Sequence, residues 1–163
     1  MLPGIQIRAL AKRVDDRGFF MEALRTDWRD LLGDDTIVQA NLSLSHPGII
    51  RAWHRHLRGQ VDYFLVVRGT MRICAYDDSP SSPTRGQLTE TVSSGEVPSV
   101  VRVPGHYWHG TMALGGEPSL TLYFTTRLYD YGQPDEERRP WNDPGIIDPR
   151  TGQPYDWLRP VHR

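Results

Sequence analysis

The stretch QVDYFLVVRGTMRICAYDD, residues 60–78, decides the fold class. Apolar and β-branched residues fill two runs on either side of Arg68-Gly69-Thr70, which predicts two buried strands joined at a glycine. The same criteria predict strands at 36–45, at 99–114 around a Pro-Gly turn, and at 118–131 as one long alternating strand. Many short strands separated by turn residues predict an all-β fold, either a sandwich or a barrel.

Two segments depart from this strand pattern. Residues 22–35 place apolar side chains at helical spacing before Gly33, which predicts one short N-terminal helix. Residues 132–163 are rich in proline and charge, yet they keep Trp141, Ile146, Tyr155 and Trp157. A disordered tail lacks large apolar groups. We therefore expect an irregular but ordered C-terminal arm, wrapped over the barrel or over a partner subunit, within a single domain spanning 1–163.

The composition and charge of the chain limit the kinds of partner that it is expected to bind. The net charge is −1, with acidic and basic residues interleaved, so no general nucleic-acid surface is expected. The longest apolar runs are strand-sized, and residues 1–25 hold no apolar signal region, so we expect no membrane partner and a cytoplasmic location. The single cysteine, Cys74, excludes an internal disulfide and a cysteine-based zinc site.

Histidines and a carboxylate gather at the start of the first predicted strand, in RAWHRHLRGQVD, residues 51–62. His54 and His56 are two residues apart, so both point to one face of a strand, and Asp62 keeps the same parity. His109 follows the Pro-Gly turn later in the chain. This layout resembles the metal-binding motifs of the cupin barrel. Imidazoles with a carboxylate suit a divalent transition metal, so a metal-dependent enzyme is one open interpretation.

A wider resemblance covers roughly residues 3–147. The segments that carry it are DDRGFFMEALR (15–25), QANLSLS (39–45), RAWH (51–54), SPTRG (82–86), PGHYWHG (104–110), TTRLYDY (125–131) and PDEERRPWNDP (134–144). In this order and spacing they resemble the nucleotide-sugar 3,5-epimerase family, which includes dTDP-4-dehydrorhamnose 3,5-epimerase. The resemblance implies a cupin-type antiparallel β-barrel (jelly roll), a homodimer, and epimerase or isomerase activity on a nucleotide-linked 4-keto-6-deoxy sugar. It implies no metal and no other cofactor.

The resemblance also implies roles for individual residues. His54 is the base that removes a proton at C3, C5 or both, and Tyr129 is the acid on the opposite face, with Tyr131 as the alternative. The residues implied to bind substrate are Arg51 at the diphosphate or keto group, Gln39, Asn41 and His109 in the sugar pocket, and Arg17, Phe20 and Glu22 at the nucleotide, often across a dimer interface.

The chain departs from the family pattern at one position. The family has a lysine seven residues before the glycine that ends this strand, and counting back from Gly69 gives Asp62. An anion there opposes the negative charge that develops on the enolate oxygen. The arginines that can replace the lysine are Arg51, Arg55, Arg58 and Arg127. The resemblance also implies a late aspartate that orients the histidine base, and the candidates for it are Asp156, Asp143 and Asp148.

Asp62 therefore leaves three interpretations open. The first is an epimerase that uses Asp62 within an altered catalytic site. The second is a metal-dependent enzyme with His54, His56, Asp62 and His109 as ligands. The third is a relative that binds nucleotide sugars without turnover.

Overall fold

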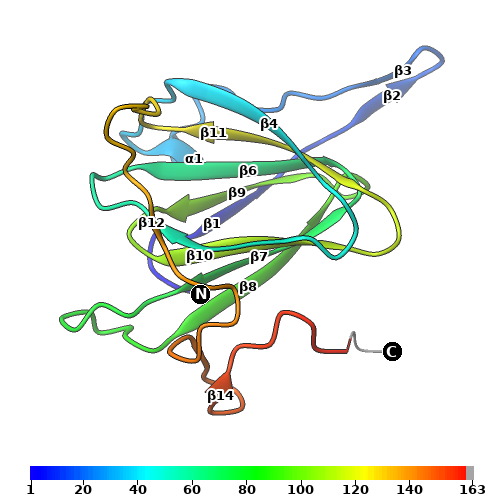
Figure 1. Ribbon diagram of the computed structural model, residues 1–163. Helices are drawn as coiled ribbons and strands as arrows, with labels where there is room; N and C mark the ends of the chain where they lie inside the picture. The colour runs from blue at the N-terminus through cyan, green and yellow to red at the C-terminus, as the bar shows by residue number, and fades with distance from the viewer. Residues whose placement is uncertain (161–163) are drawn as a thin grey trace.

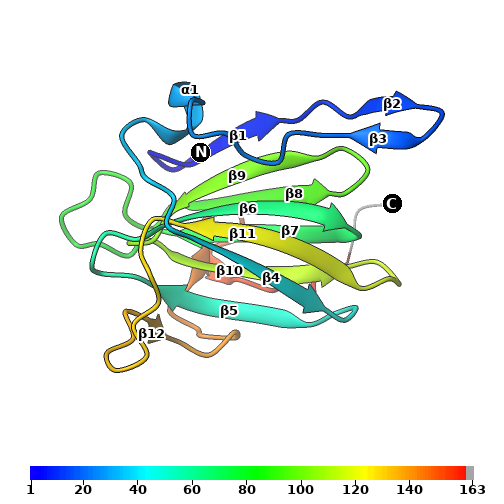
Figure 2. The same ribbon diagram turned by 90° about the horizontal axis from the view of Figure 1, so that it is seen from above.

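The computed structural model describes residues 1–160, and two stacked antiparallel sheets form its body (Figures 1 and 2). The first sheet has the order β1 (Gln6–Ala9), β9 (Ser99–Pro104), β6 (Val61–Arg68), β11 (Ser119–Thr125), β4 (Gln39–Ser45). The second has the order β12 (Glu137–Arg138), β5 (Ile50–Arg55), β10 (Trp108–Leu114), β7 (Thr70–Tyr76), β8 (Leu88–Ser94). The all-β jelly-roll prediction is confirmed.

The chain changes sheets at the glycine turns that the sequence marked. β6 and β7 are consecutive in the chain, but they lie in different sheets and are joined by Gly69. Gly69 has a φ of +74°, and a Cβ there would lie 2.6 Å from the carbonyl oxygen of Pro118. β9 and β10 also lie in different sheets, on either side of Pro104 and Gly105. These crossings fold one continuous pattern of strands into two layers.

One end of the space between the sheets is filled by an apolar core. Phe64 and Val66 of β6 pack with Ile73 of β7 and Val101 of β9, and all four are buried. Alternate residues of the same strands point to the outer faces of the sheets, as the pleat of a strand requires.

The predicted helix is much too long. α1 spans only Arg29–Leu32. Arg25 forms ion pairs with Glu22 and Asp27, within a turn that precedes the helix. Leu24 and the residues of α1 instead pack on the outer face of the first sheet. The apolar residues of this segment contact the sheet, and an irregular segment can make such contacts as well as a helix can.

The long strand predicted at 118–131 is also too long, because β11 ends at Thr125. Residues 126–131 leave the sheet as a loop, so Tyr129 and Tyr131 do not share a strand face as their spacing suggested. Two short hairpins complete the structure, β2 (Arg13–Asp15) with β3 (Gly18–Phe20) and β13 (Ile147–Asp148) with β14 (Gln153–Pro154).

The C-terminal arm packs on its own chain, which is one of the two arrangements left open above. β12 pairs with β5, and Trp157 is fully buried against Trp53 on the outer face of the second sheet. Ile146 and Tyr155 join the same cluster. Within residues 1–160, no helix has the length and hydropathy needed to cross a membrane.

Candidate functional site

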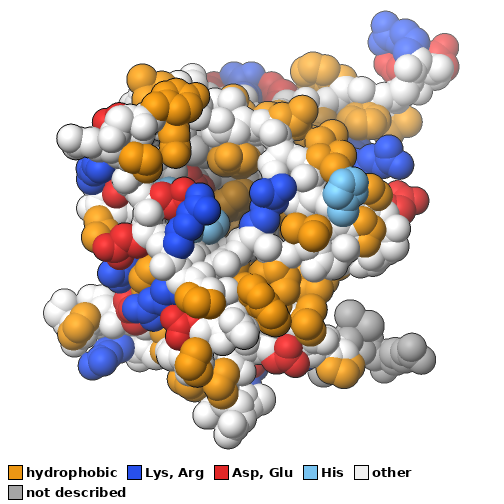
Figure 3. Space-filling view, in the orientation of Figure 1, with side chains coloured by type: hydrophobic (Ala, Val, Ile, Leu, Met, Phe, Trp, Pro, Cys, Tyr) orange, Lys and Arg blue, Asp and Glu red, His pale blue; other side chains and the backbone are white. Residues whose placement is uncertain are grey.

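A cavity of about 1490 Å³ opens at the other end of the space between the sheets. Figure 3 shows it as a hollow ringed by basic and acidic side chains, with histidine atoms at its bottom. Strands β4, β5, β6 and β11 form its walls, and residues 126–132 and 135–139 form its rim.

One wall of the cavity is polar. Polar and apolar residues alternate along β4 and β11, and the polar ones point into the cavity. On β4 the inward residues are Gln39, Asn41, Ser43 and Ser45, and on β11 they are Thr121, Tyr123 and Thr125. Gln39 Nε2 donates to Asn41 Oδ1 at 2.8 Å. The structure therefore brings both predicted residues, Gln39 and Asn41, to the cavity. The sequence analysis missed the five hydroxyl side chains beside them, although the alternation in QANLSLS signals the serines.

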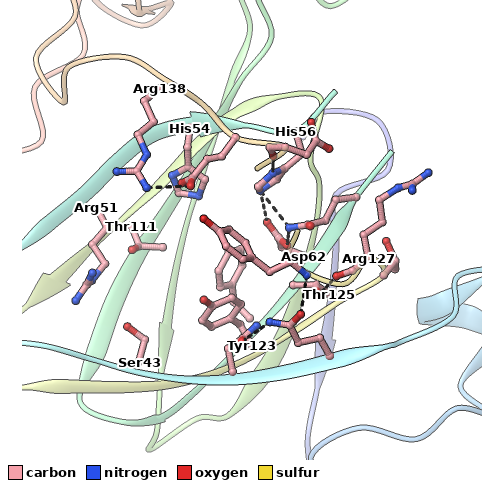
Figure 4. A pocket seen from close by; sticks show the side chains of 18 of the residues that line it. Ser43, Arg51, His54, His56, Asp62, Thr111, Tyr123, Thr125, Arg127 and Arg138 are labelled. Atoms are coloured by element: carbon pink, nitrogen blue, oxygen red, sulfur yellow. Dashed lines mark hydrogen bonds and ion pairs between the residues drawn. The ribbon is translucent and has the colours of Figure 1, made fainter. Parts of the chain in front are cut away.

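His54 and His56 lie on the facing wall, whereas His109, predicted to line the sugar pocket, is fully buried beside them and is not among the residues that line the cavity. His54 of β5 lies opposite His109 of β10 in the register of the second sheet, and their ring centroids are 4.2 Å apart. His56 lies 5.5 Å from His109 and 5.9 Å from His54 by the same measure. Figure 4 shows His54 and His56 pointing into the cavity, with Ser43 and Tyr123 on the far side.

Asp62 of β6 joins this cluster from the other sheet. Its Oδ2 lies 3.1 Å from His109 Nε2 and 3.4 Å from His56 Nε2. Gln60 Nε2 donates to Asp62 Oδ1 at 2.8 Å. Burial opposes the ionisation of Asp62, but the bonds to His109 and His56 outweigh it and hold the pKa of Asp62 below its ordinary value. The predicted group of His54, His56, Asp62 and His109 is therefore real as a spatial cluster.

His54 differs from the other two histidines in its electrostatics. Burial and the neighbouring His109 hold the pKa of His54 well below its ordinary value. His54 is therefore neutral at pH 7 and has an unprotonated ring nitrogen.

Three arginines bring positive charge to the cavity. Arg51 and Arg127 line it and form no ion pair within residues 1–160, and Arg51 Nε donates to Ser45 Oγ at 3.0 Å. Arg138, which the sequence analysis did not select, reaches the cavity from β12 because β12 pairs with β5 beside His54. Figure 4 shows Arg51 and Arg138 on the same side as His54.

Two other candidate cations are neutralised by acidic side chains. Arg55 pairs with Glu137 and Asp78 and stacks over Trp108, outside the cavity. Arg58 lines the cavity but lies 3.9 Å from Asp135. Arg138 also forms an ion pair, at 2.9 Å from Glu136. Within residues 1–160, the lining arginines that form no ion pair are therefore Arg51 and Arg127.

Tyr129 and Tyr131 line the mouth of the cavity from the loop that follows β11. Their ring centroids are 5.0 Å apart, and the backbone N–H of Tyr129 donates to Gln39 Oε1 at 2.9 Å. Tyr129 is 47% exposed and Tyr131 is 90% exposed. The Gln39 contact fixes the backbone of Tyr129 relative to the polar wall.

Three predicted binding residues lie away from this cavity. The β2–β3 hairpin projects from the body of the molecule, as Figure 1 shows, and it carries Arg17 and Phe20. Arg17 pairs with Asp15 of the same hairpin, Phe20 is 64% exposed, and Glu22 pairs with Arg25. A single chain does not bring these residues to its own histidines.

The aspartates suggested as partners of His54 are bonded elsewhere. Asp148 pairs with Arg150 at 2.7 Å, Asp143 accepts from the Gly145 N–H, and Asp156 accepts from the Leu158 N–H. Within residues 1–160, none of these three aspartates bonds to His54.

Comparisons with known proteins find a matching family model and similar sequences. The family model described as dTDP-4-dehydrorhamnose 3,5-epimerase matches residues 1–148. A Haloferax volcanii protein named probable low-salt glycan biosynthesis epimerase Agl13 is 41% identical over 97% of this chain and 96% of its own. The Bacillus subtilis spore coat polysaccharide biosynthesis protein SpsL is 37% identical over 90% of this chain and 94% of its own.

A solved structure shares the fold as well. The epimerase RmlC of Legionella pneumophila, solved in complex with dTDP-4-keto-L-rhamnose, superposes with a TM-score of 0.79 at 28% identity. The match covers 89% of this chain and 77% of that one.

Proposed function

The chain belongs to the dTDP-4-dehydrorhamnose 3,5-epimerase family, and from that premise we propose that it epimerises a dTDP-linked 4-keto-6-deoxy sugar. One observation carries the proposal. His54 points into a cavity that has hydroxyl groups on its facing wall and is lined by Arg51 and Arg127, which form no ion pair within the described part of the chain. Hydroxyls suit a sugar, and the planar fork of arginine suits a diphosphate.

The chemistry needs a base on one face of the sugar ring and an acid on the other. A proton on carbon beside a ketone is removable because the electron pair left behind moves to the ketone oxygen. We assign the base to His54 and the acid to Tyr129, and the returned proton inverts the carbon at C3, at C5 or at both. Arg51 and Arg138 stand beside His54, where they can stabilise the negative oxygen.

The arrangement of subunits is part of the proposal. We propose a homodimer in which the projecting β2–β3 hairpin of one chain brings Arg17, Phe20 and Glu22 toward the nucleotide bound by the other. Support comes from their position: Phe20 is highly exposed, and Arg17 lies at the tip of the hairpin. A cytoplasmic location stays a prediction from the sequence.

The first test is proton exchange in heavy water. A dTDP-linked 4-keto-6-deoxyhexose is incubated with the protein in D₂O, and NMR follows deuterium at C3 and C5. We expect exchange with the wild type and a loss of about 100- to 10,000-fold for His54→Asn, the range for removal of a positioned base. The exposed His46 provides the matched control, His46→Gln, which is expected to exchange at the wild-type rate.

Each contrary outcome has a clear meaning. Exchange that persists in His54→Asn removes His54 from the role of base. A wild type that binds dTDP in calorimetry but never exchanges is a binding protein, and the proposed function then fails.

The acid is tested by comparing three phenylalanine variants. Tyr129→Phe is expected to slow inversion far more than Tyr131→Phe or Tyr123→Phe while leaving His54-dependent exchange measurable. An equal or larger effect of Tyr131→Phe would transfer the role to that residue.

A further inference from the structure

The carboxylate of Asp78, in the loop after β7, accepts hydrogen bonds from the side chains of three other segments. The donors are Arg55 Nη1 of β5 at 3.1 Å, Trp108 Nε1 of β10 at 2.8 Å and Arg139 Nη2, next to β12, at 2.5 Å. The guanidinium carbons of Arg55 and Arg139 lie 4.5 Å and 4.2 Å from the centroid of the Trp108 ring. Charges that are partly shielded from water attract one another more strongly than fully exposed ones. These four residues form the Asp78 cluster, which ties the four segments together.

The Asp78 cluster holds both residues that flank Arg138. Glu137 accepts a hydrogen bond from Arg55 Nε at 2.6 Å, and Arg139 is bound to Asp78. The backbone of Arg139 also exchanges two hydrogen bonds with β5, at 2.9 Å and 3.1 Å. β12 is only two residues long and lies at the edge of the second sheet. Because so short a strand gains little from its own pairing, the cluster is its anchor.

Arg138 lies between these two anchored residues and beside His54 (Figure 4). Side chains alternate along a strand, so Arg138 leaves β12 on the opposite side from Glu137 and Arg139. Its side chain is 76% exposed, and Glu136 accepts a hydrogen bond from its Nη2 at 2.9 Å. A guanidinium has five N–H donors, so others can turn to a substrate. Since little packing holds this side chain, its position depends on the backbone of β12.

We propose that Asp78 is a positioning residue for the epimerisation site, because its cluster fixes β12 and thereby places Arg138 beside His54. Arg138 then stabilises the negative oxygen that forms when His54 removes a proton. The family resemblance assigns this charge to a lysine, and Asp62 stands at the lysine position here. A cation from a different strand restores the positive charge. The role of Arg138 rests on the proposed function, whereas the anchoring of β12 by Asp78 does not.

The anchoring is tested on the protein without substrate by hydrogen-exchange mass spectrometry. Asp78→Asn nearly keeps the side-chain volume and removes the charge that holds both arginines. Peptides that cover residues 135–141 are expected to exchange at least tenfold faster than in the wild type, while β6 and β7 keep the wild-type rate. The exposed Asp34 provides the matched control, Asp34→Asn, which is expected to exchange as the wild type does. Wild-type exchange at 135–141 in Asp78→Asn overturns the anchoring.

The role of Arg138 is tested by deuterium exchange into the sugar at saturating substrate. Arg138→Gln is expected to lower kcat about 100- to 1,000-fold, the range for removal of one donor to a developing oxyanion, while dTDP affinity in calorimetry stays within about threefold. Arg85→Gln, at an exposed position, is the control and is expected to keep the wild-type kcat. A tenfold loss of dTDP affinity with unchanged kcat would make Arg138 a diphosphate-binding residue and overturn this role.

A double-mutant cycle shows whether Asp78 acts through Arg138. Asp78→Asn alone is expected to lower kcat at least tenfold with little change in KM, and Asp78→Glu, which keeps the charge, is expected to recover most of the loss. Added to Arg138→Gln, Asp78→Asn is expected to cause less than about a twofold further loss, because the residue it positions is already gone. Losses that multiply in full overturn the positioning role.

The two assays separate this inference from the proposed function. A wild type that never exchanges deuterium into the sugar removes the proposed function and the role of Arg138, and exchange at residues 135–141 then decides the anchoring by itself. A wild type that exchanges, with an unaffected Arg138→Gln variant, keeps the epimerase proposal and overturns the role of Arg138.

Discussion

The outer faces of the two sheets are both apolar, but they differ in how completely other segments of the chain cover them. On the second sheet, the C-terminal arm lays Ile146, Tyr155 and Trp157 over Trp53, and all four are at most 4% exposed. On the first sheet, the segment around α1 covers β6 and β9 but leaves β4 open. Leu42 and Leu44 of β4 are 68% and 49% exposed.

The difference shows why the fold of one chain leaves an apolar surface. β4 directs its polar residues into the cavity, so the alternation of the strand forces its leucines outward. The second sheet also directs apolar side chains outward, and there the C-terminal arm of the same chain covers them. A second copy of the chain is the cover that we propose for β4, in agreement with the proposed homodimer.

Breaking the covered face gives the largest expected effect on stability. Trp157→Ala removes a fully buried ring whose centroid lies 4.9 Å from that of Trp53. We expect the free energy of unfolding to fall by about 3–5 kcal/mol, the usual cost of deleting a buried aromatic side chain. Urea unfolding followed by tryptophan fluorescence and circular dichroism measures it.

The neighbouring Leu158 supplies the control, because it is 58% exposed. Leu158→Ala is expected to change stability by less than about 0.5 kcal/mol. A loss below about 1 kcal/mol for Trp157→Ala would show that the arm contributes little to the folded domain and that its cover is dispensable.

Acid is expected to weaken the same cover through Glu90 of β8. Burial raises the pKa of Glu90, but hydrogen bonds from Tyr155 and Arg159 of the arm outweigh burial and hold it below its ordinary value. A lowered folded-state pKa gives stability that is complete above the unfolded value of about 4.3 and is lost as the pH falls through the folded value.

Glu90→Gln tests this link between the arm and the second sheet. We expect the variant to be about 1.5–3 kcal/mol less stable than the wild type at pH 7, the range for hydrogen bonds to a charged group. The gap is expected to narrow in urea titrations at pH 4 and pH 3. A gap that stays constant with pH would mean that the charge of Glu90 does not hold the arm.

The sequence predicted the strands better than the elements at their ends. Alternation and glycine turns placed β4, β6 and β7 nearly correctly, because these patterns arise from the pleat and from positive φ at Gly69. The helix at 22–35 and the extension of β11 to residue 131 were wrong. Both segments had suitable spacing, but contact with a sheet and with the cavity rim decided their shape.

The site was predicted in part for a similar reason. The expectation of one strand face for His54, His56 and Asp62 was wrong, because β5 ends at Arg55 and Asp62 lies on β6 of the other sheet. The three side chains still meet, because the two sheets face each other, and the order of motifs added Gln39. Arg138 was missed, since it reaches the cavity only through the pairing of β12 with β5, more than 80 residues from it in sequence. A contact between segments that are far apart in the chain leaves no pattern in the sequence around either residue.

Charging the open face gives the smallest expected effect on the stability of a single chain and a large one on assembly. Leu42→Glu with Leu44→Glu is expected to turn a dimer into a monomer in sedimentation experiments, while the monomer's free energy of unfolding changes by about 0.5 kcal/mol or less. Val92→Glu, at a 56% exposed position on β8, is the matched control and is expected to leave the dimer intact. A double variant that remains dimeric would place the subunit contact elsewhere, and a monomeric wild type would leave β4 uncovered and contradict the homodimer itself.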